Sequence, residues 1–190
     1  MDSSERGLSL RLRKLIQVGL LSSLAACFMI LLQVPLFPSA PFLTYDPSEV
    51  PAILAAFSLG PLWGVGVVLI KNLLFVMLRF QPVELVGLPL NTLAGATLVW
   101  VAGAVYARRR RPVPAVMFGT LAATAVMMPV NLLAYPLVAW LFALPVPAGL
   151  TDFVLFVVTP FNLVKGLLSG ALACVVYRKL RHLTDFFRSP

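Results

Sequence analysis

Charged side chains in this sequence gather in a few short segments, and the stretches between them are apolar. Twelve of the 15 Lys and Arg fall within residues 6–14, 108–111 and 178–188. The apolar stretches reach about 20 residues, the length of one helical bilayer crossing. The chain is 60% hydrophobic and 12% charged, whereas soluble domains are about half apolar and a quarter charged. The sequence therefore predicts a polytopic membrane protein.

We expect an all-α fold with six transmembrane helices in a single domain. Because Lys and Arg concentrate in cytoplasmic segments, the three basic segments predict that both termini are cytoplasmic. Pro has no amide donor, so residues 35–47, with four prolines, are predicted to form an outer loop. No signal-peptide cleavage site follows the first apolar run, which we expect to be retained. The predicted helices are 15–34, 48–59, 62–79, 86–107, 113–144 (bent near Asn131 by Pro129 and Pro136) and 152–177.

Several functional classes are disfavoured by what the sequence contains. The net charge of +8 follows the helix ends and forms no basic groove with interleaved aromatics, so we expect no nucleic-acid partner. Cys27 and Cys174 lie in apolar runs and His182 is the single histidine, a set that predicts no metal site. The chain has no phosphate-binding loop and no nucleophile–base set at a shared depth. We therefore expect a binding protein without a cofactor, and not an enzyme.

Polar side chains on different predicted helices fall at similar depths in the membrane. At 1.5 Å per residue, Asn91 lies roughly 25 Å above Arg108, and Asn131 nominally ~28 Å above Pro112. Asn162 and Lys165 lie roughly 24 and 20 Å above Arg178. Charged groups inside a membrane segment face a cavity or another helix. Three amides and one ammonium thus predict a pocket near the outer surface, and mixed donors and acceptors suit a neutral heterocycle.

Two further features have both a structural and a functional interpretation. Lys71 and Asn72 lie near the midplane, either as internal partners or as substrate-coupling groups. Arg79 and Glu84 are predicted to form a pair at the outer rim. Small residues on one face of the first helix allow close helix approach, either inside the chain or at a partner interface; they are Gly19, Ser22, Ser23 and Ala26.

The segment PFLTYDPSEVPAILAAFSLGP, followed by IKN, resembles the riboflavin-specific S component of energy-coupling factor (ECF) transporters. That family has a motif of the form F-L-x-x-D-x-S-x-[IV]-P, then G-P and I-K-N. PLN at 89–91, PVN at 129–131 and FNLVKG at 161–166 also resemble family landmarks. The motif residues here are Phe42, Leu43, Asp46, Ser48, Val50, Pro51, Gly60, Pro61 and Ile70-Lys71-Asn72.

This resemblance implies a multi-pass protein of the bacterial plasma membrane that captures riboflavin from outside. Riboflavin would be the transported ligand, and the partners would be a transmembrane T component and two ATPases. The T component would dock on helix 1, where Gly19 and Ser23 replace the family's A-x-x-x-A. Alternatives are an S component for another vitamin, a stand-alone solute carrier, or a structural membrane protein. The substrate-binding residues carried over are Leu43, Thr44, Asp46, Asn91, Asn131, Asn162 and Lys165.

Overall fold

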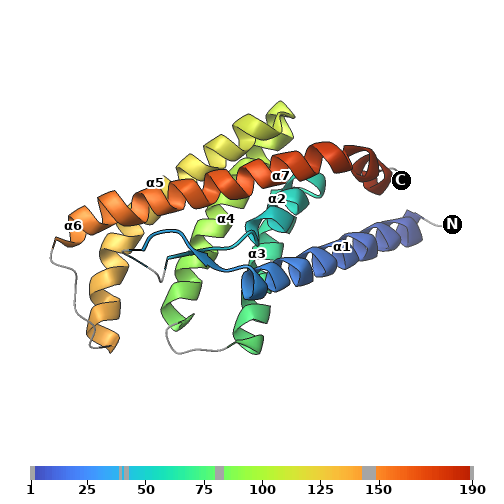
Figure 1. Cartoon of the computed structure of the whole chain (residues 1–190). Helices are drawn as coiled ribbons and strands as arrows, with labels where there is room; N and C mark the ends of the chain where they lie inside the picture. The colour runs from blue at the N-terminus through green and yellow to red at the C-terminus, as the bar shows by residue number, and fades with distance from the viewer. Residues whose placement is uncertain (1–2, 39, 41–42, 80–83, 143–148, 189–190) are drawn as a thin grey trace.

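The computed structural model describes residues 3–38, 40, 43–79, 84–142 and 149–188. Phe42 and the side chain of Glu84 lie outside this description. Five described helices are long and apolar enough to cross a membrane, and α2 is a shorter apolar helix. The elements, shown in Figure 1, are α1 (Ser3–Leu31), β1 (Val34–Pro35), β2 (Thr44–Tyr45), α2 (Glu49–Ser58), α3 (Pro61–Leu78), α4 (Glu84–Arg109), α5 (Pro112–Phe142), α6 (Leu150–Phe153), η1 (Val154–Val158) and α7 (Thr159–Arg188).

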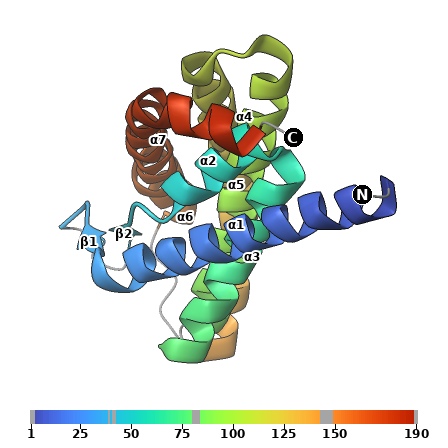
Figure 2. The same ribbon diagram turned by 90° about the vertical axis from the view of Figure 1, so that its right-hand side faces the viewer.

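The predicted outer loop contains a small antiparallel strand pair. Val34 pairs with Tyr45, and Pro35 pairs with Thr44. A residue that precedes proline disfavours the helical conformation, so α1 ends at Leu31 and not at the predicted residue 34. Figure 2 shows β1 and β2 beside the end of α1. The strand pair thereby fixes the position of the segment that leads into α2.

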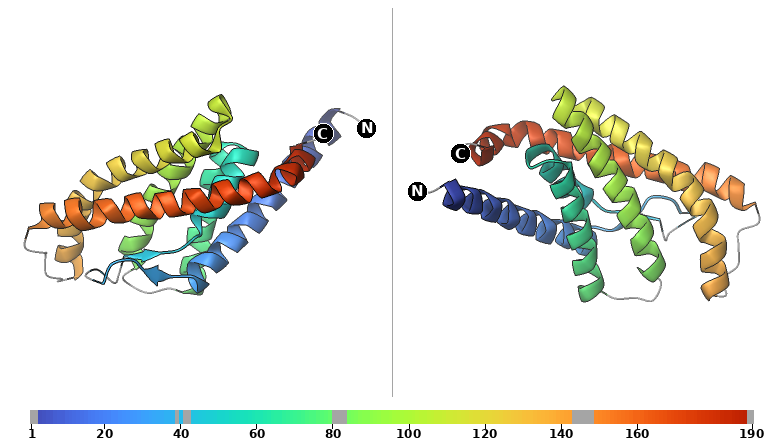
Figure 3. Two further views of the ribbon diagram at one scale, coloured as in Figure 1. Left: turned by 45° about the horizontal axis from the view of Figure 1, so that its top comes forward. Right: turned by 180° about the vertical axis from the view of Figure 1, so that it is seen from behind.

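Prolines shape the two longest apolar segments. α5 runs through Pro129 and Pro136 without a break in its helix, and Figure 3 shows its axis changing direction part-way along, as proline kinks do. Before Pro160, residues Val154–Val158 form a π-helical turn. The wider turn accommodates a residue that cannot donate to the preceding turn, and Thr159 Oγ1 donates to Val154 O at 2.9 Å.

α2 lies at the centre of the helix bundle, packed against α1, α3, α4 and α7. Eight of its ten residues are buried. Its neighbours approach closely at glycines. A Cβ on Gly64 would lie 2.5 Å from Val99 Cγ1 and 2.8 Å from Ala52 O. Small residues at these positions let the backbones approach, as at helix contacts in membranes.

α5 and α7 pack antiparallel through the glycines of α7. Gly166 faces Thr120, because a Cβ at that glycine would lie 2.6 Å from Thr120 Cγ2. Gly170 faces Val116 in the same way. The register follows directly: each turn further along α7 meets one turn earlier on α5. This register determines which polar side chains of α5 and α7 lie opposite each other.

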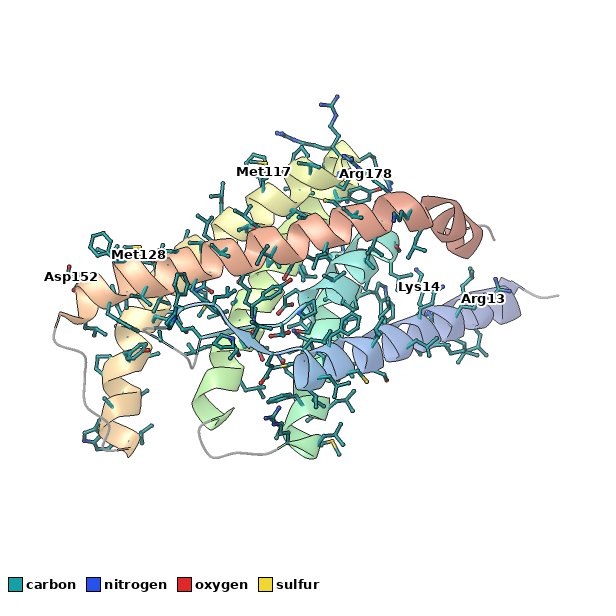
Figure 4. The ribbon with its side chains drawn as sticks, viewed as in Figure 1. Arg13, Lys14, Met117, Met128, Asp152 and Arg178 are labelled. Carbon is teal, nitrogen blue, oxygen red and sulfur yellow. The ribbon has the colours of Figure 1, made fainter. Side chains whose placement is uncertain are left out.

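The two termini lie at the same end of the molecule (Figure 1). Figure 4 shows Arg13, Lys14 and Arg178 toward that end and Asp152 at the opposite end. α1 begins at Ser3, well before the predicted start at residue 15, and its apolar span begins at Leu10. Arg6 therefore precedes the apolar span, and Arg11, Arg13 and Lys14 lie in its first turns.

Candidate functional site

Three predicted site residues from three parts of the chain meet at Lys165. Lys165 Nζ, on α7, donates to Asp46 Oδ2 at 3.2 Å and to Asn91 Oδ1 at 3.1 Å. Asp46 follows β2, and Asn91 lies on α4. The three residues are separated by as many as 119 positions in sequence. The structure therefore brings together the ammonium, one amide and the loop carboxylate, which we name the Lys165 cluster.

Asp46 is held by its own loop as well as by Lys165. Ser48 N donates to Asp46 Oδ1 at 3.0 Å, so the carboxylate closes the turn that begins α2. Burial acts to raise the pKa of Asp46, but the ammonium groups of Lys165 and Lys71 and the hydrogen bonds from Ser48 outweigh it. The pKa of this carboxyl therefore lies well below its usual value. Asp46 is ionised at neutral pH.

A second lysine–carboxylate pair lies beside the first. Lys71 Nζ, on α3, donates to Glu49 Oε1 at 2.8 Å and also to Ser48 Oγ. The Lys71 side chain is 0% exposed and that of Glu49 is 3% exposed. Glu49 also packs against α4, because a Cβ on Gly95 would lie 2.9 Å from both carboxylate oxygens. We name Ser48, Glu49 and Lys71 the Lys71 cluster.

Ser48 joins the two clusters, through its backbone to Asp46 and through its hydroxyl to Lys71. The resulting chain of bonds runs from α4 through α7 to the β2–α2 turn and on to α3. It contains two ammonium groups and two carboxylates, so its formal charge is zero. Neutral, hydrogen-bonded sets of this kind are the form in which charges are tolerated inside a membrane protein. The chain of bonds fixes the loop that carries Asp46.

The other two predicted amides take part in different bonds. Asn131 Nδ2 donates to Met127 O at 2.7 Å, and Asn162 Nδ2 donates to Val158 O at 2.9 Å. Each amide donates to a carbonyl four residues earlier in the chain, which for Asn162 is the last residue of η1, and among the described residues neither amide bonds to the Lys165 cluster. With Gly166 opposite Thr120, Asn131 lies about two turns, or roughly 10 Å, further along α5 than the level of Asn162. Asn131 and Asn162 therefore do not lie opposite each other along the contact between α5 and α7.

The remaining predicted loop residues, Leu43 and Thr44, precede Asp46 directly. Leu43 O accepts from Leu36 N at 3.4 Å, and Thr44 lies in β2. Tyr45 is half-buried, with its hydroxyl near Ser169 of α7, and burial raises the pKa of its phenol. The strand pair thus places the loop over the α7 face that carries Lys165.

The small residues of α1 divide between two faces. Ser22 and Ala26 are buried inside the chain, together with Ala25. Gly19 and Ser23 are exposed, and Ser23 Oγ donates to Gly19 O at 3.0 Å. Ser22 and Ala26 therefore pack inside the chain, whereas Gly19 and Ser23 lie on an exposed face, for which the partner interface stays a prediction.

Sequence reasoning missed the partner role of Ser48 and Glu49. The sequence motif contains Ser48 without assigning it a partner, and Glu49 occupies an unspecified position of that motif. The Ser48 side chain makes no cap bond to the helix and accepts from Lys71 instead. An acid at the start of an apolar helix and a lysine within the next one is the signal that identifies such a pair. Arg79, predicted to pair with Glu84, donates through Nη1 to Ile30 O at 3.4 Å.

Comparison with known proteins agrees with this architecture. The riboflavin transporter RibU of Staphylococcus aureus (strain TCH60) is 34% identical over 88% of this chain and 90% of its own length. The riboflavin transporter FmnP of Bacillus subtilis (strain 168) is 31% identical over 95% of this chain and 98% of its own. These relatives are transporters and not enzymes.

A solved structure of the S component of a bacterial ECF transporter has a similar fold. Its TM-score is 0.77 at 28% sequence identity, and the match covers 91% of this chain and 98% of that chain. The family model for "ECF transporter, substrate-specific component" matches residues 13–177. This chain therefore belongs to the family of substrate-specific components of ECF transporters.

Proposed function

We propose that this protein is the riboflavin-binding subunit of an ECF transporter in the bacterial plasma membrane. The observation that carries the proposal is the Lys165 cluster, in which the carboxylate of the loop motif meets an ammonium and an amide from two other helices. The relatives of similar length are named riboflavin transporters. Riboflavin is a neutral ring system whose polar edge both donates and accepts hydrogen bonds.

The chemistry of the cluster suits such a ligand. An ammonium has three donors, and the Lys165 ammonium uses two of them on Asp46 and Asn91. Asn91 accepts from Lys165 through Oδ1, and its amide group also has two donors at Nδ2. A ligand edge that donates and accepts can enter this set by exchanging hydrogen bonds. We propose that Leu43, Thr44, Asn131 and Asn162 contact other parts of the same ligand.

In this proposal both termini are cytoplasmic and the β1–β2 loop faces outside. The basic segments at the end of the molecule that holds the termini support this orientation. A T component, docked on the exposed Gly19 and Ser23 of α1, and two ATPases would drive delivery inward. The orientation is tested by fusing a reporter that is active on only one side of the membrane to the C-terminus.

The ligand is tested by titrating purified, flavin-free protein with riboflavin and following quenching of flavin fluorescence. We expect saturable quenching, weakened at least about ten-fold by Lys165→Ala, because a charge-assisted hydrogen bond contributes ~1.5–3 kcal/mol. Lys179→Ala, an exposed lysine on the same helix, is the matched control and should bind like wild type. If wild-type protein shows no quenching and another vitamin produces a thermal shift, riboflavin is not the substrate and that other vitamin takes its place.

A further inference from the structure

A hollow of about 210 Å³ lies beside the α4–α5 turn, away from the Lys165 cluster. Its lining consists of Val105, Arg108, Arg109 and Phe118. Arg108 and Arg109 form the last turn of α4, and Phe118 lies two turns into α5. α4 and α5 are in close contact just beyond it, since a Cβ on Gly119 would lie 2.5 Å from Leu98 O. The hollow therefore lies on the outside of a rigid helical hairpin.

The lining combines two cations with an apolar floor. Arg109 Cζ lies 5.5 Å from the centre of the Phe118 ring, a cation–π contact that holds this guanidinium beside the aromatic part of the lining. Phe118 is 47% exposed, and the neighbouring Met117 is 52% exposed. Both guanidinium groups belong to exposed residues, and the salt bridges of the described residues include neither. The hollow thus has positive charge that no described salt bridge neutralises, beside an apolar surface at the end of a membrane span.

We propose that this hollow binds the head group of an anionic phospholipid. The two guanidinium groups would hold the phosphate through paired N–H donors, the geometry in which Arg recognises phosphate. Val105 and Phe118 would contact the glycerol and the first methylenes of an acyl chain. Basic pockets between membrane helices on the cytoplasmic side suit anionic head groups in this way. The inference does not depend on the identity of the transported solute.

The adjacent arginines, Arg110 and Arg111, provide a matched control for non-specific electrostatic attraction between the protein and an anionic lipid. Arg110 turns away from the hollow: its Cζ lies 6.0 Å from the Tyr106 ring, and it lines a separate hollow beside the α2–α3 turn. Arg111 does not line the lipid hollow. Replacing either adjacent pair of arginines by Gln removes two charges from the same turn. Only Arg108→Gln/Arg109→Gln removes them from the hollow itself.

The experiment uses full-length protein in a mild detergent, titrated with phosphatidylglycerol and followed by native mass spectrometry. Each direct guanidinium–phosphate hydrogen bond contributes about ten-fold or more to the affinity for an anionic lipid. We expect Arg108→Gln/Arg109→Gln to weaken phosphatidylglycerol binding by about 100-fold or more, because both direct contacts are lost. Arg110→Gln/Arg111→Gln should change it by a few-fold at most. Phe118→Ala should reduce phosphatidylglycerol binding while leaving the charge unchanged.

Two further arms identify the ligand. Phosphatidylcholine, which is zwitterionic, and inorganic phosphate, which has no acyl chain, should each bind much more weakly than phosphatidylglycerol. Equal losses in the two arginine double variants would show a diffuse electrostatic effect and overturn the proposal. Unchanged phosphatidylglycerol binding in Arg108→Gln/Arg109→Gln would also overturn the proposal. A melting temperature close to that of wild type confirms that each variant is folded.

Discussion

The buried pair of Lys71 and Glu49 provides the sharpest test of how this bundle is held together. The perturbation is a double-mutant cycle: Lys71→Met, Glu49→Met, and the two together. Met is close in volume to both side chains and has no charge. The exposed Lys179→Met serves as the control for loss of a lysine at a solvated position.

The magnitude follows from the geometry. At 2.8 Å and an effective dielectric constant of about 20, the attraction is about 6 kcal/mol. Removing two ions from water costs several kcal/mol each, so the pair as a whole contributes little net stability. Removing one partner leaves the other charge buried without compensation, which costs ~3–5 kcal/mol. Both single variants should therefore be strongly destabilised, and the double variant should recover most of the loss.

The assay is thermal unfolding of the purified protein in detergent. For a chain of this length ~1 kcal/mol corresponds to about 2–4 °C, so each single variant should melt on the order of 10 °C below wild type. The double variant should melt within a few degrees of wild type. If the two single losses simply add in the double variant, the coupling assigned to this pair is wrong. A single variant as stable as wild type would likewise contradict full burial of the pair.

Three further predictions concern packing, pH and an interhelical bond. Gly64→Ala should destabilise the protein by ~1–3 kcal/mol through overpacking, whereas Gly66→Ala, with open space at its Cβ, should be neutral or slightly stabilising; thermal unfolding compares them. Because the pKa of Asp46 is depressed, its ion pair stabilises the fold above the unfolded pKa of ~3.9 and is lost as the pH falls toward the folded pKa. The difference in melting temperature between wild type and Asp46→Asn should therefore be constant from ~pH 5 to ~8 and shrink below ~pH 4; shrinkage near neutral pH would contradict this. Thr92→Val removes the 2.7 Å acceptor of Asn72 Nδ2 and should cost ~0.6 kcal/mol or somewhat more in thermal unfolding.

Much of the fold could be predicted because a bilayer restricts the options so strongly. Backbone groups in lipid must be bonded internally, so each long apolar run was predicted to be a helix. The prolines marked the loop before Asp46 and the bend in α5. Helix ends were less predictable: α1 begins at Ser3, twelve residues before the predicted start, and the π turn before Pro160 has no sequence signature of its own.

The candidate site was predicted only in part, because depth along a helix does not determine rotation about its axis. Asn91 and Lys165 were predicted at similar depths and meet in the structure. Asn131 and Asn162 were grouped with them, yet each donates to a carbonyl four residues earlier in the chain. A bonding choice of that kind depends on which groups the neighbouring helix presents, and the sequence does not contain this information.

The sequence by itself determined that the chain crosses a membrane several times and that its few internal charges matter, since an unpaired charge in lipid is too costly to retain. Only the tertiary structure decided the pairing. Asp46 and Glu49 are three residues apart, yet one pairs with Lys165 and the other with Lys71. The reason is directional: the turn closed by Ser48 sends the first carboxylate toward α7, and the first turn of α2 points the second toward α3.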